Sequence, residues 1–273
     1  MEEVTVKVVC VQVEPVYKDP AATMAKVTKL LVPVISADVI LLPEMAFPGY
    51  TFDNAEDIQP YLEEPNERFP TFRWCQSEAQ RTHSYVVCGY PETAPDGLFN
   101  SQMVISPEGT LVTNYRKHFL YMLDKTWAQA GGEFSTVEIR IHGKKVRLGL
   151  GICMDINPCE FTAPFEDYEL ATHWKVSQAD LMAFSTNWTS SRPDEDPKQL
   201  INYWALRLTP VLEDAHKAAF FLAADRVGSE KGTAFMGSSC IVQTRPPKLL
   251  ASLDKTSEGL LQRSVVLTLC RET

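Results

Sequence analysis

The chain has 273 residues, of which 45% are hydrophobic and 22% are charged. This composition is typical of a folded protein with one large domain or two small ones. The formal net charge of −9 argues against nucleic acid or an anionic membrane surface as a partner. No apolar stretch reaches the roughly 20 residues that cross a bilayer, and the start Met1–Glu3 lacks the basic and apolar segments of a secretion signal.

The cysteines and histidines form no recognisable metal or disulfide pattern. Seven cysteines are scattered without a C-x-x-C pair, and five histidines show no spacing typical of metal ligands. An odd, scattered set of cysteines favours reduced thiols inside a cell. We therefore expect a cytoplasmic protein, with the nucleus as a further compartment, that uses neither a metal nor another cofactor.

The first half of the chain alternates strand and helix patterns. A valine-rich alternating run predicts the first strand, and Asp19 followed by Pro20 is typical of a helix start. Pro33 should bend or end that helix. The expected elements are a strand over residues 4–13, a helix over 20–35, a strand over 38–43, a helix over 66–83 and a strand over 85–90.

The second half is richer in hairpins. Pro107–Gly109 and His142–Gly143 are turn signals between apolar runs, and breaks are expected at Pro164 and Pro210. The expected strands are residues 102–105, 110–115, 137–141, 145–152, 181–186, 218–227, 239–243, 248–253 and 260–269, with helices over 158–174 and 197–217. Alternating elements followed by hairpins favour an α/β sandwich of two helix-covered sheets over a purely parallel sheet.

Three of these runs end in a residue with catalytic potential. Glu44 follows residues 38–43, Lys117 follows the run that ends at Tyr115, and Cys153 follows Ile152. A base, a cation and a thiol are the groups needed to attack an amide carbon and to stabilise the resulting oxyanion. Because a charge beside buried backbone needs a partner or a task, the three positions predict a catalytic site.

Each residue also has an ordinary interpretation. A cysteine in an apolar strand is usually a small buried hydrophobe, and Glu44 or Lys117 could be a surface charge. The other cysteines lack a comparable setting and are expected to be structural or incidental: Cys10, Cys75, Cys88, Cys159, Cys240 and Cys270. No histidine has a setting that would pair it with a cysteine.

The order of these motifs resembles the nitrilase superfamily of carbon–nitrogen hydrolases. The matching stretches are Leu42–Glu44 followed by Phe47–Tyr50, then Tyr115–Lys117, then Gly151–Asp155, and later Asn187–Trp188 and Asp225–Gly228 with Glu230, Gly232, Phe235 and Gly237. The resemblance extends from about residue 4 to residue 269. It implies a nitrilase-like α-β-β-α sandwich, with one carbon–nitrogen hydrolase domain over residues 1–273 and Glu44, Lys117 and Cys153 as the catalytic triad.

Two further stretches are similar to one branch, the fungal-type protein N-terminal asparagine/glutamine amidohydrolases. They are residues 117–127 and residues 153–158 with the aromatic segment that follows, 161–169. The resemblance implies deamidation of N-terminal Asn or Gln of a protein or peptide, with ammonia release, feeding an arginylation-dependent degradation pathway. Members of the superfamily often pair as homodimers, which makes a homodimer an expectation here.

The sequence departs from the superfamily pattern at two places. Asn157 stands where many members have an arginine, which leaves Asp155 either to bind a substrate amine or to be satisfied by backbone. The second glutamate that often follows the lysine corresponds to Asp124, one methylene shorter. We expect Asp124 to support the triad.

The resemblance and the chemistry together predict the remaining roles. Glu44 should take the thiol proton, and Lys117 should lower the pKa of Cys153. Lys117 and the backbone N–H of Met154 should stabilise the oxyanion. Asp155 is the first choice to bind the substrate's α-ammonium, with Asp124, Asp53 and Glu160 as alternatives, while Asn187 and Trp188 should contact substrate or simply pack as loop residues.

Two rival functions remain. An amidase of a small-molecule amide, of the ω-amidase or carbamoyl-amine hydrolase type, would use the same three residues. Such an enzyme would need an arginine for a substrate carboxylate, and Asn157 occupies the position where the wider family often has one. The second rival is a binding protein without catalysis, which the intact triad disfavours.

Overall fold

The computed structural model describes residues 2–190, 195–214 and 217–269, and its first sheet has the strand order β15-β1-β2-β3-β4-β5. The strands β1, β2 and β3 are parallel, and the remaining neighbours pair antiparallel. The strand bounds are β1 Glu2–Gln12, β2 Val39–Leu41, β3 Tyr85–Ala94, β4 Gly97–Ile105, β5 Leu111–Arg116 and β15 Gly259–Leu269. Both expected hairpin strands β4 and β5 are therefore present.

The second sheet has the order β14-β13-β10-β8-β7-β6, and its strands β7, β8 and β10 are parallel. Its bounds are β6 Thr136–Ile141, β7 Lys144–Ile152, β8 Leu181–Ser185, β10 Phe220–Ala224, β13 Cys240–Thr244 and β14 Pro247–Ser252. The residues at the ends of the parallel strands are in register: Ile152 pairs with Ser185, and Ser185 pairs with Ala224. The residues that follow these three strands therefore lie together at one edge of the second sheet.

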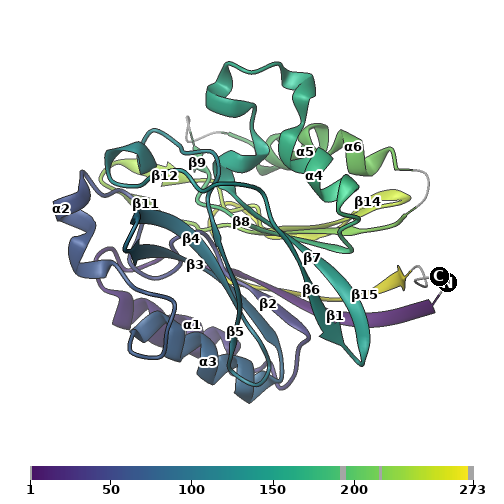
Figure 1. Cartoon of the computed structure of the whole chain (residues 1–273), viewed down its shortest axis with the longest axis horizontal. Helices are drawn as coiled ribbons and strands as arrows, with labels where there is room; N and C mark the ends of the chain where they lie inside the picture. The colour runs from purple at the N-terminus through teal and green to yellow at the C-terminus, as the bar shows by residue number, and fades with distance from the viewer. Residues whose placement is uncertain (1, 191–194, 215–216, 270–273) are drawn as a thin grey trace.

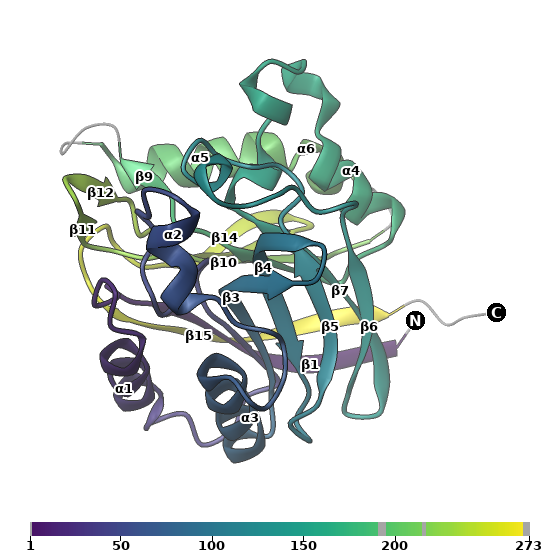
Figure 2. The same cartoon turned by 60° about the vertical axis from the view of Figure 1, so that its left-hand side comes forward.

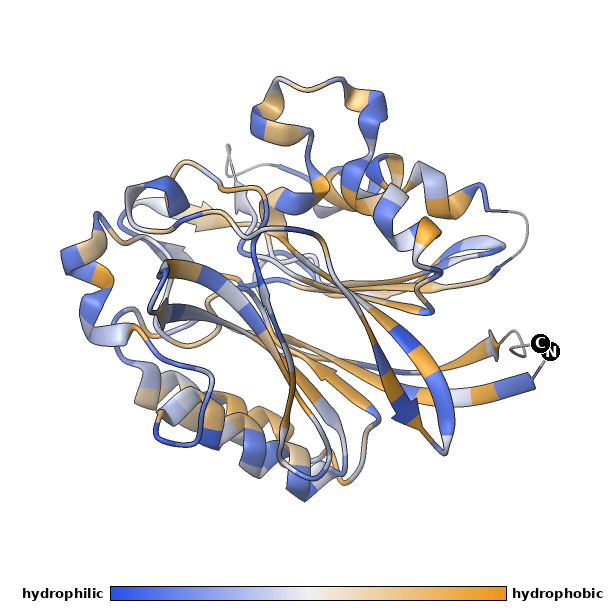
Figure 3. Ribbon diagram, viewed as in Figure 1, coloured by the Kyte–Doolittle hydropathy of each residue, from blue (hydrophilic) through white to orange (hydrophobic). Residues whose placement is uncertain are grey.

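The two sheets face each other, and each carries helices on its outer face (Figures 1 and 2). Helices α1 (Pro20–Leu31) and α3 (Pro70–Thr82) cover the first sheet, and α4 (Glu169–Val176), α5 (Pro197–Arg207) and α6 (Thr209–Leu212) cover the second. Apolar residues of both sheets form one core between them, and the strands carry long apolar stretches (Figure 3). The expected α-β-β-α sandwich is confirmed.

Local sequence explains where the helices begin and end. The Asp19 side chain accepts a hydrogen bond from Ala22 N and Pro20 begins α1, which ends at Leu31 before Pro33. Its buried residues Thr23, Val27 and Leu31 recur every four positions, as expected for one face of a helix. Helix α3 ends at His83, whose left-handed backbone (φ +55°) closes the last turn.

Two of the expected helices are divided in the structure. The helix expected over residues 197–217 is two helices, because α5 ends at Arg207 and α6 starts at Thr209, directly before Pro210. Residues 215–216 of that span and Cys270 lie outside the described residues. The segment 158–174 contains the 3-10 turns η4 (Cys159–Phe161) and η5 (Phe165–Asp167) before α4, consistent with the break expected at Pro164.

Several short elements were not anticipated. They are helix α2 (Ala55–Ile58), the 3-10 turns η1 (Gln59–Tyr61), η2 (Asp124–Thr126) and η3 (Cys153–Ile156), and a small sheet of β11 (Ser229–Glu230), β12 (Thr233–Phe235) and β9 (Thr189–Ser190). Segments of two to four residues are too short to produce a readable periodicity. Within the described ranges, no helix has the length and apolar character needed to cross a membrane.

Candidate active site

Glu44 and Lys117 form a buried ion pair between the sheets. Lys117 Nζ lies 2.6 Å from Glu44 Oε1 and 2.6 Å from Asp124 Oδ2, and all three side chains are fully buried. Asn100 joins the same two carboxylates, because its Nδ2 donates to Glu44 Oε1 at 2.7 Å and to Asp124 Oδ1 at 2.9 Å. Glu44 Oε2 accepts the backbone N–H of Asn187 at 2.9 Å.

These contacts fix the charges of the pair. Burial raises the pKa of Glu44, while Lys117 acts in the opposite direction. Burial alone would lower the pKa of Lys117, but the carboxylates of Asp124 and Glu44 outweigh it and raise that pKa above its ordinary value. The lysine is therefore a permanent cation, and Glu44 is a carboxylate whose proton affinity is increased, as a general base requires.

Cys153 begins the 3-10 turn η3 at the end of β7 and has a left-handed backbone, with φ +39°. A non-glycine residue in that region costs about 1–3 kcal/mol, and such strain is common at active sites. Its side chain is buried, and burial followed by the Glu44 charge raises the pKa of the thiol well above its usual value, against Lys117, Thr186 and the Asn187 backbone.

As expected, Lys117 acts to lower the pKa of Cys153, but burial and the Glu44 charge outweigh it. Lys117 shares its charge with Glu44 and Asp124, so little of it remains to favour a thiolate. Cys153 consequently rests as a neutral thiol, and its proton has to leave during the attack. Met154 follows Cys153 in η3, where the first N–H groups of a turn have no acceptor within it, so its oxyanion role stays a prediction.

Asp155 is bonded as a structural acid, which favours the second of the two roles expected for it over that of the amine ligand. It is fully buried, and its two oxygens accept four hydrogen bonds, from Tyr115 Oη (2.7 Å) and from the backbone N–H groups of His118 (3.0 Å), Phe119 (2.8 Å) and Ile152 (2.8 Å). These bonds tie the segment after Lys117 to the turn that carries Cys153. The alternative, an acid satisfied largely by backbone, fits this geometry.

Of the other acids considered for the amine, two are exposed and paired with lysines, and the third is occupied within the site. Glu160 is exposed and pairs with Lys125 at 2.6 Å. Asp53 is also exposed and pairs with Lys231 at 2.7 Å. Asp124 is at the site, but its carboxylate is occupied by Lys117, Asn100 and the backbone N–H of Tyr121. Asp124 therefore lies beside Lys117, as expected.

Asn187 and Trp188 follow β8, next to the catalytic residues. The Asn187 side chain is buried, and within the described part of the chain neither its Oδ1 nor its Nδ2 has a hydrogen-bond partner. Trp188 is half-buried. Its ring is tilted against that of Tyr203 and packs edge-on against Trp204, with ring centroids 5.7 Å apart in both pairs. The unpaired side-chain amide favours a role for Asn187 in binding the substrate. The Trp188 ring, in contrast, is packed against the rings of Tyr203 and Trp204.

Sequence reasoning missed several residues of this site. Asn100 bridges Glu44 and Asp124, Thr186 lies beside the Cys153 thiol, and the buried Tyr50 hydroxyl has no partner. Asp225 was noticed only as part of a motif, although it directly follows the buried strand β10. The rule that selected Glu44, a polar residue at the exit of a buried strand, would also have selected Asp225.

The segment that carries Tyr50 is held by a second buried ion pair. Arg226 pairs with Glu230 and lies 3.9 Å above the ring of Phe235. Glu230 Oε2 accepts the backbone N–H groups of Tyr50 (2.9 Å) and Thr51 (3.0 Å). Gly49, with φ +95°, allows this approach, because a Cβ there would lie 2.7 Å from Glu230 Oε1.

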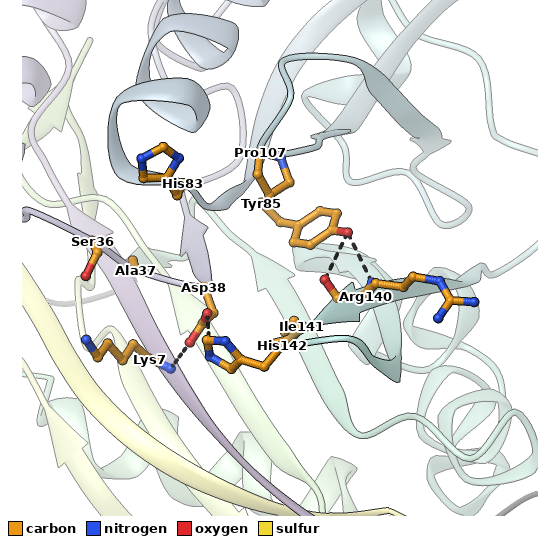
Figure 4. Close-up of a pocket in the computed structure, with 10 residues that line it drawn as sticks. All are labelled: Lys7, Ser36, Ala37, Asp38, His83, Tyr85, Pro107, Arg140, Ile141 and His142. Carbon is orange, nitrogen blue, oxygen red and sulfur yellow. Dashed lines mark hydrogen bonds and ion pairs between the residues drawn. The ribbon is translucent and has the colours of Figure 1, made fainter.

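A pocket at the opposite edge of the sheets is separate from these residues (Figure 4). It surrounds the start of β2, where Asp38 accepts the backbone N–H of Lys7 at 2.7 Å and lies 3.1 Å from His142 Nε2. Tyr85 Oη is bonded to the backbone of Arg140. These contacts fasten the turn between β6 and β7 to the first sheet, and none of the predicted catalytic residues lines this pocket.

The geometry of the opposite, catalytic edge suits attack on an amide. It combines a neutral thiol, a carboxylate able to accept its proton, and a fixed lysine cation beside both. Such a set supports covalent catalysis through a thioester.

Comparisons with known proteins agree with this chemistry. The family model for carbon–nitrogen hydrolase matches residues 7–165. A protein N-terminal amidase of Schizosaccharomyces pombe is 33% identical over 230 residues, which cover 76% of this chain and 79% of that protein. A protein N-terminal amidase of Saccharomyces cerevisiae is 30% identical over 270 residues, covering 90% of this chain and 56% of the relative.

The fold has close counterparts among solved structures. Crystal structures of N-terminal amidase with an Asn-Glu-Ala peptide and with a Gln-Gly peptide match with TM-scores of 0.89 and 0.90 at 21% identity. Both cover 98% of this chain and 99% of the solved one. At this identity the likeness concerns the fold.

Proposed function

The chain belongs to the carbon–nitrogen hydrolase family, and from this premise we propose that it deamidates N-terminal Asn and Gln of proteins or peptides, giving Asp and Glu with release of ammonia. The observation that carries the chemistry is the buried Glu44–Lys117 pair beside Cys153. The choice of substrate is supported by the two relatives named protein N-terminal amidase.

The reaction begins with proton transfer from the thiol. Glu44 accepts the proton of Cys153 while the sulfur attacks the side-chain carboxamide carbon. Lys117 and the Met154 N–H stabilise the oxygen that becomes negative, and losing one such donor typically costs about 2.7–4 kcal/mol. Because Lys117 is already held by two carboxylates, it needs no reorganisation as charge develops.

Collapse of the tetrahedral intermediate releases ammonia and leaves a thioester on Cys153. Glu44 gives its proton to the departing nitrogen, then removes a proton from the water that attacks the thioester carbonyl and returns it to the sulfur as the thioester breaks. The products are the free thiol and a substrate whose first residue carries a carboxylic acid, which ionises by losing its proton to solvent. The transfers to and from sulfur, nitrogen and water all pass through Glu44, whose raised pKa suits it to both directions of transfer.

The biological setting is part of the same proposal. We expect the product to enter an N-degron degradation pathway, in the cytoplasm and also in the nucleus, and the enzyme to form a homodimer. The free thiols of Cys10, Cys75, Cys88, Cys153, Cys159 and Cys240 are consistent with a reducing compartment.

The test is ammonia release from a panel of matched peptides that start with Asn, Gln, Asp or acetylated Asn. We expect release from the Asn and Gln peptides, and none from the other two. Free glutamine and glutaramate are included to test for a small-amide amidase. Comparable rates on acetylated and free Asn peptides, or faster release from glutaramate, would reject the N-terminal activity, and Cys153→Ala controls for contaminating amidases.

A further inference from the structure

Asp225 is a buried carboxylate with one unused oxygen. It is fully buried at the end of β10, and its Oδ1 accepts the backbone N–H groups of Trp188 (3.0 Å) and Arg226 (2.7 Å). Among the residues that the structure describes, its Oδ2 has no hydrogen-bond partner, and it is the one buried carboxylate oxygen there in this condition. Leaving a polar oxygen unpaired in the interior is costly, so this oxygen calls for a ligand.

Strand register places Asp225 in line with the nucleophile. Ile152, Ser185 and Ala224 are register partners across β7, β8 and β10, so Cys153 and Asp225 are the next residues on strands two positions apart. Neighbouring strands are about 4.8 Å apart, which puts the two backbones about 10 Å from each other. Asn187 follows β8, the strand between them.

That separation suits an amino acid that binds side chain first. The amide carbon of asparagine is three bonds from its α-nitrogen, a span of about 3–4 Å. The side chains of Cys153 and Asp225 and one hydrogen bond cover the remaining distance. An amide carbon held at Cys153 therefore leaves the α-nitrogen within reach of Asp225, with glutamine longer by one methylene.

Charge also favours a cation at this position. Glu44 and Asp124 are buried carboxylates that share one lysine, Lys117, and Asp225 is a further buried acid. After the larger effect of burial, the Glu44 charge raises the pKa of Asp225, while Arg226, which pairs with Glu230, lowers it. An added ammonium would offset this excess of negative charge.

We propose that Asp225 binds the α-ammonium of the substrate's first residue and so makes the enzyme selective for free N-termini. The inference rests on the proposed function and assigns the specificity of the same site to a carboxylate other than Asp155. With an acetylated or internal residue, the Asp225 oxygen stays unpaired in the buried site. The free-energy penalty of that unpaired oxygen discriminates between substrates more strongly than a loss of contact area does.

The test compares two substrates of the same shape. One is an Asn-initiated peptide, and the other carries a succinamoyl group in place of Asn, which is asparagine without its α-amine. The variant is Asp225→Asn, because its amide oxygen can still accept the Trp188 and Arg226 N–H groups while its NH₂ replaces the free oxygen. We expect kcat/KM for the Asn peptide to fall about 10- to 100-fold, while the succinamoyl peptide changes by less than about twofold.

Asp155→Asn is the matched control, since it removes a buried carboxylate that is fully bonded within the protein. It should slow both substrates in the same proportion. If Asp225→Asn does the same, Asp225 only supports the backbone and the inference is overturned. It is also overturned if Asp225→Asn keeps the preference for the free amine. If the wild-type protein releases no ammonia from the Asn peptide, the proposed function itself has failed.

A second variant keeps the proposal testable if Asp225→Asn does not fold. Asp225→Glu retains the charge and moves it one methylene toward Cys153. The α-amine of glutamine lies one methylene farther from its amide than that of asparagine, so the longer acid should disfavour Gln peptides more than Asn peptides. We expect the Asn-to-Gln ratio of kcat/KM to rise at least about threefold. An unchanged ratio would overturn the inference.

Discussion

The catalytic edge divides into two regions with opposite hydrogen-bonding states. In the catalytic region, Glu44, Lys117, Asp124 and Asp155 bond to one another or to neighbouring groups. In the adjoining region, the hydroxyl of Tyr50, both amide atoms of Asn187 and Asp225 Oδ2 have no partner among the residues that the structure describes. Buried polar groups are normally bonded, so the difference separates groups positioned for the reaction from groups that await the substrate.

The two regions carry different energetic consequences. The bonded region is preorganised, and its ions need not rearrange as charge develops in the transition state. Removing one member would leave another charge uncompensated, which typically costs 3–5 kcal/mol in a buried pair. The polar groups of the unbonded region are already buried without partners in the free protein. Hydrogen bonds to the substrate offset the free-energy cost of that burial. Substitutions should therefore affect rate and stability in the first region and selectivity in the second.

The largest effect is expected for Cys153→Ala. It removes the sulfur that forms the thioester, so ammonia release should fall to the background rate, a loss of about 10⁴-fold or more. The melting temperature should stay within a few degrees or rise, because alanine is close in size and no ion pair is disturbed. Intact protein mass spectrometry adds a direct check, since only the wild type can show an acyl adduct. Measurable turnover by the alanine variant would exclude the thioester mechanism.

Glu44→Gln breaks the bonded region without changing its shape. Glutamine can accept the Asn187 N–H but cannot take the thiol proton, so kcat should drop about 10²- to 10⁴-fold. KM should change much less, because the base acts on species formed along the reaction. Steady-state kinetics on an Asn peptide separates the two constants. A raised KM with an unaltered kcat would place Glu44 in substrate binding, with the unbonded groups.

The pH profile tests the same residue without a substitution. Burial raises the pKa of Glu44, and the base acts only when ionised, with Lys117, Asp124 and Asn100 facing it. As pH falls through that pKa, Glu44 becomes protonated and log kcat/KM should decrease toward a slope of one per pH unit. The midpoint should lie above the ordinary range of a glutamate side chain. A flat profile down to pH 4 would contradict a general base at this position.

Much of the bonded region could be predicted from the sequence, because its catalytic residues stand directly after buried apolar runs, a pattern that the sequence shows. Glu44, Lys117 and Cys153 each follow a buried run, and that position alone marks a polar residue as exceptional. The layered fold could be predicted for a similar reason. Long apolar strands and amphipathic helices leave few alternatives to a helix-covered pair of sheets.

The unbonded region could not be predicted in the same way. Asp155 and Asp225 both follow buried strands, and what distinguishes them is the number of donors that distant segments supply. Asp155 receives three from residues 115–119, while one oxygen of Asp225 receives none. Such counts depend on tertiary contacts between residues far apart in the chain, which a sequence pattern does not record.

Asp155→Asn tests the difference between these two acids through stability. The amide NH₂ must face either the Tyr115 hydroxyl and Ile152 N–H or the His118 and Phe119 N–H groups, so donors meet donors. We expect a loss of about 1–3 kcal/mol in the free energy of unfolding, measured by chemical denaturation. Selectivity for free over acetylated N-termini should persist in the folded fraction. Normal stability combined with lost selectivity would restore Asp155 as the amine ligand.

Asn187→Ala should have the smallest effect, and it examines the unbonded region alone. Its backbone N–H, which bonds Glu44, is retained, so the catalytic pair keeps its geometry. Its side-chain amide has no partner among the described residues, so removing it should leave stability unchanged or raise it by up to about 1 kcal/mol. If that amide bonds the substrate's main chain, KM for an Asn peptide should rise about 5- to 10-fold with kcat within twofold. Lower stability with an unaltered KM would show instead that Asn187 belongs to the packed structure, and the division between the two regions would then rest on Asp225 and Tyr50.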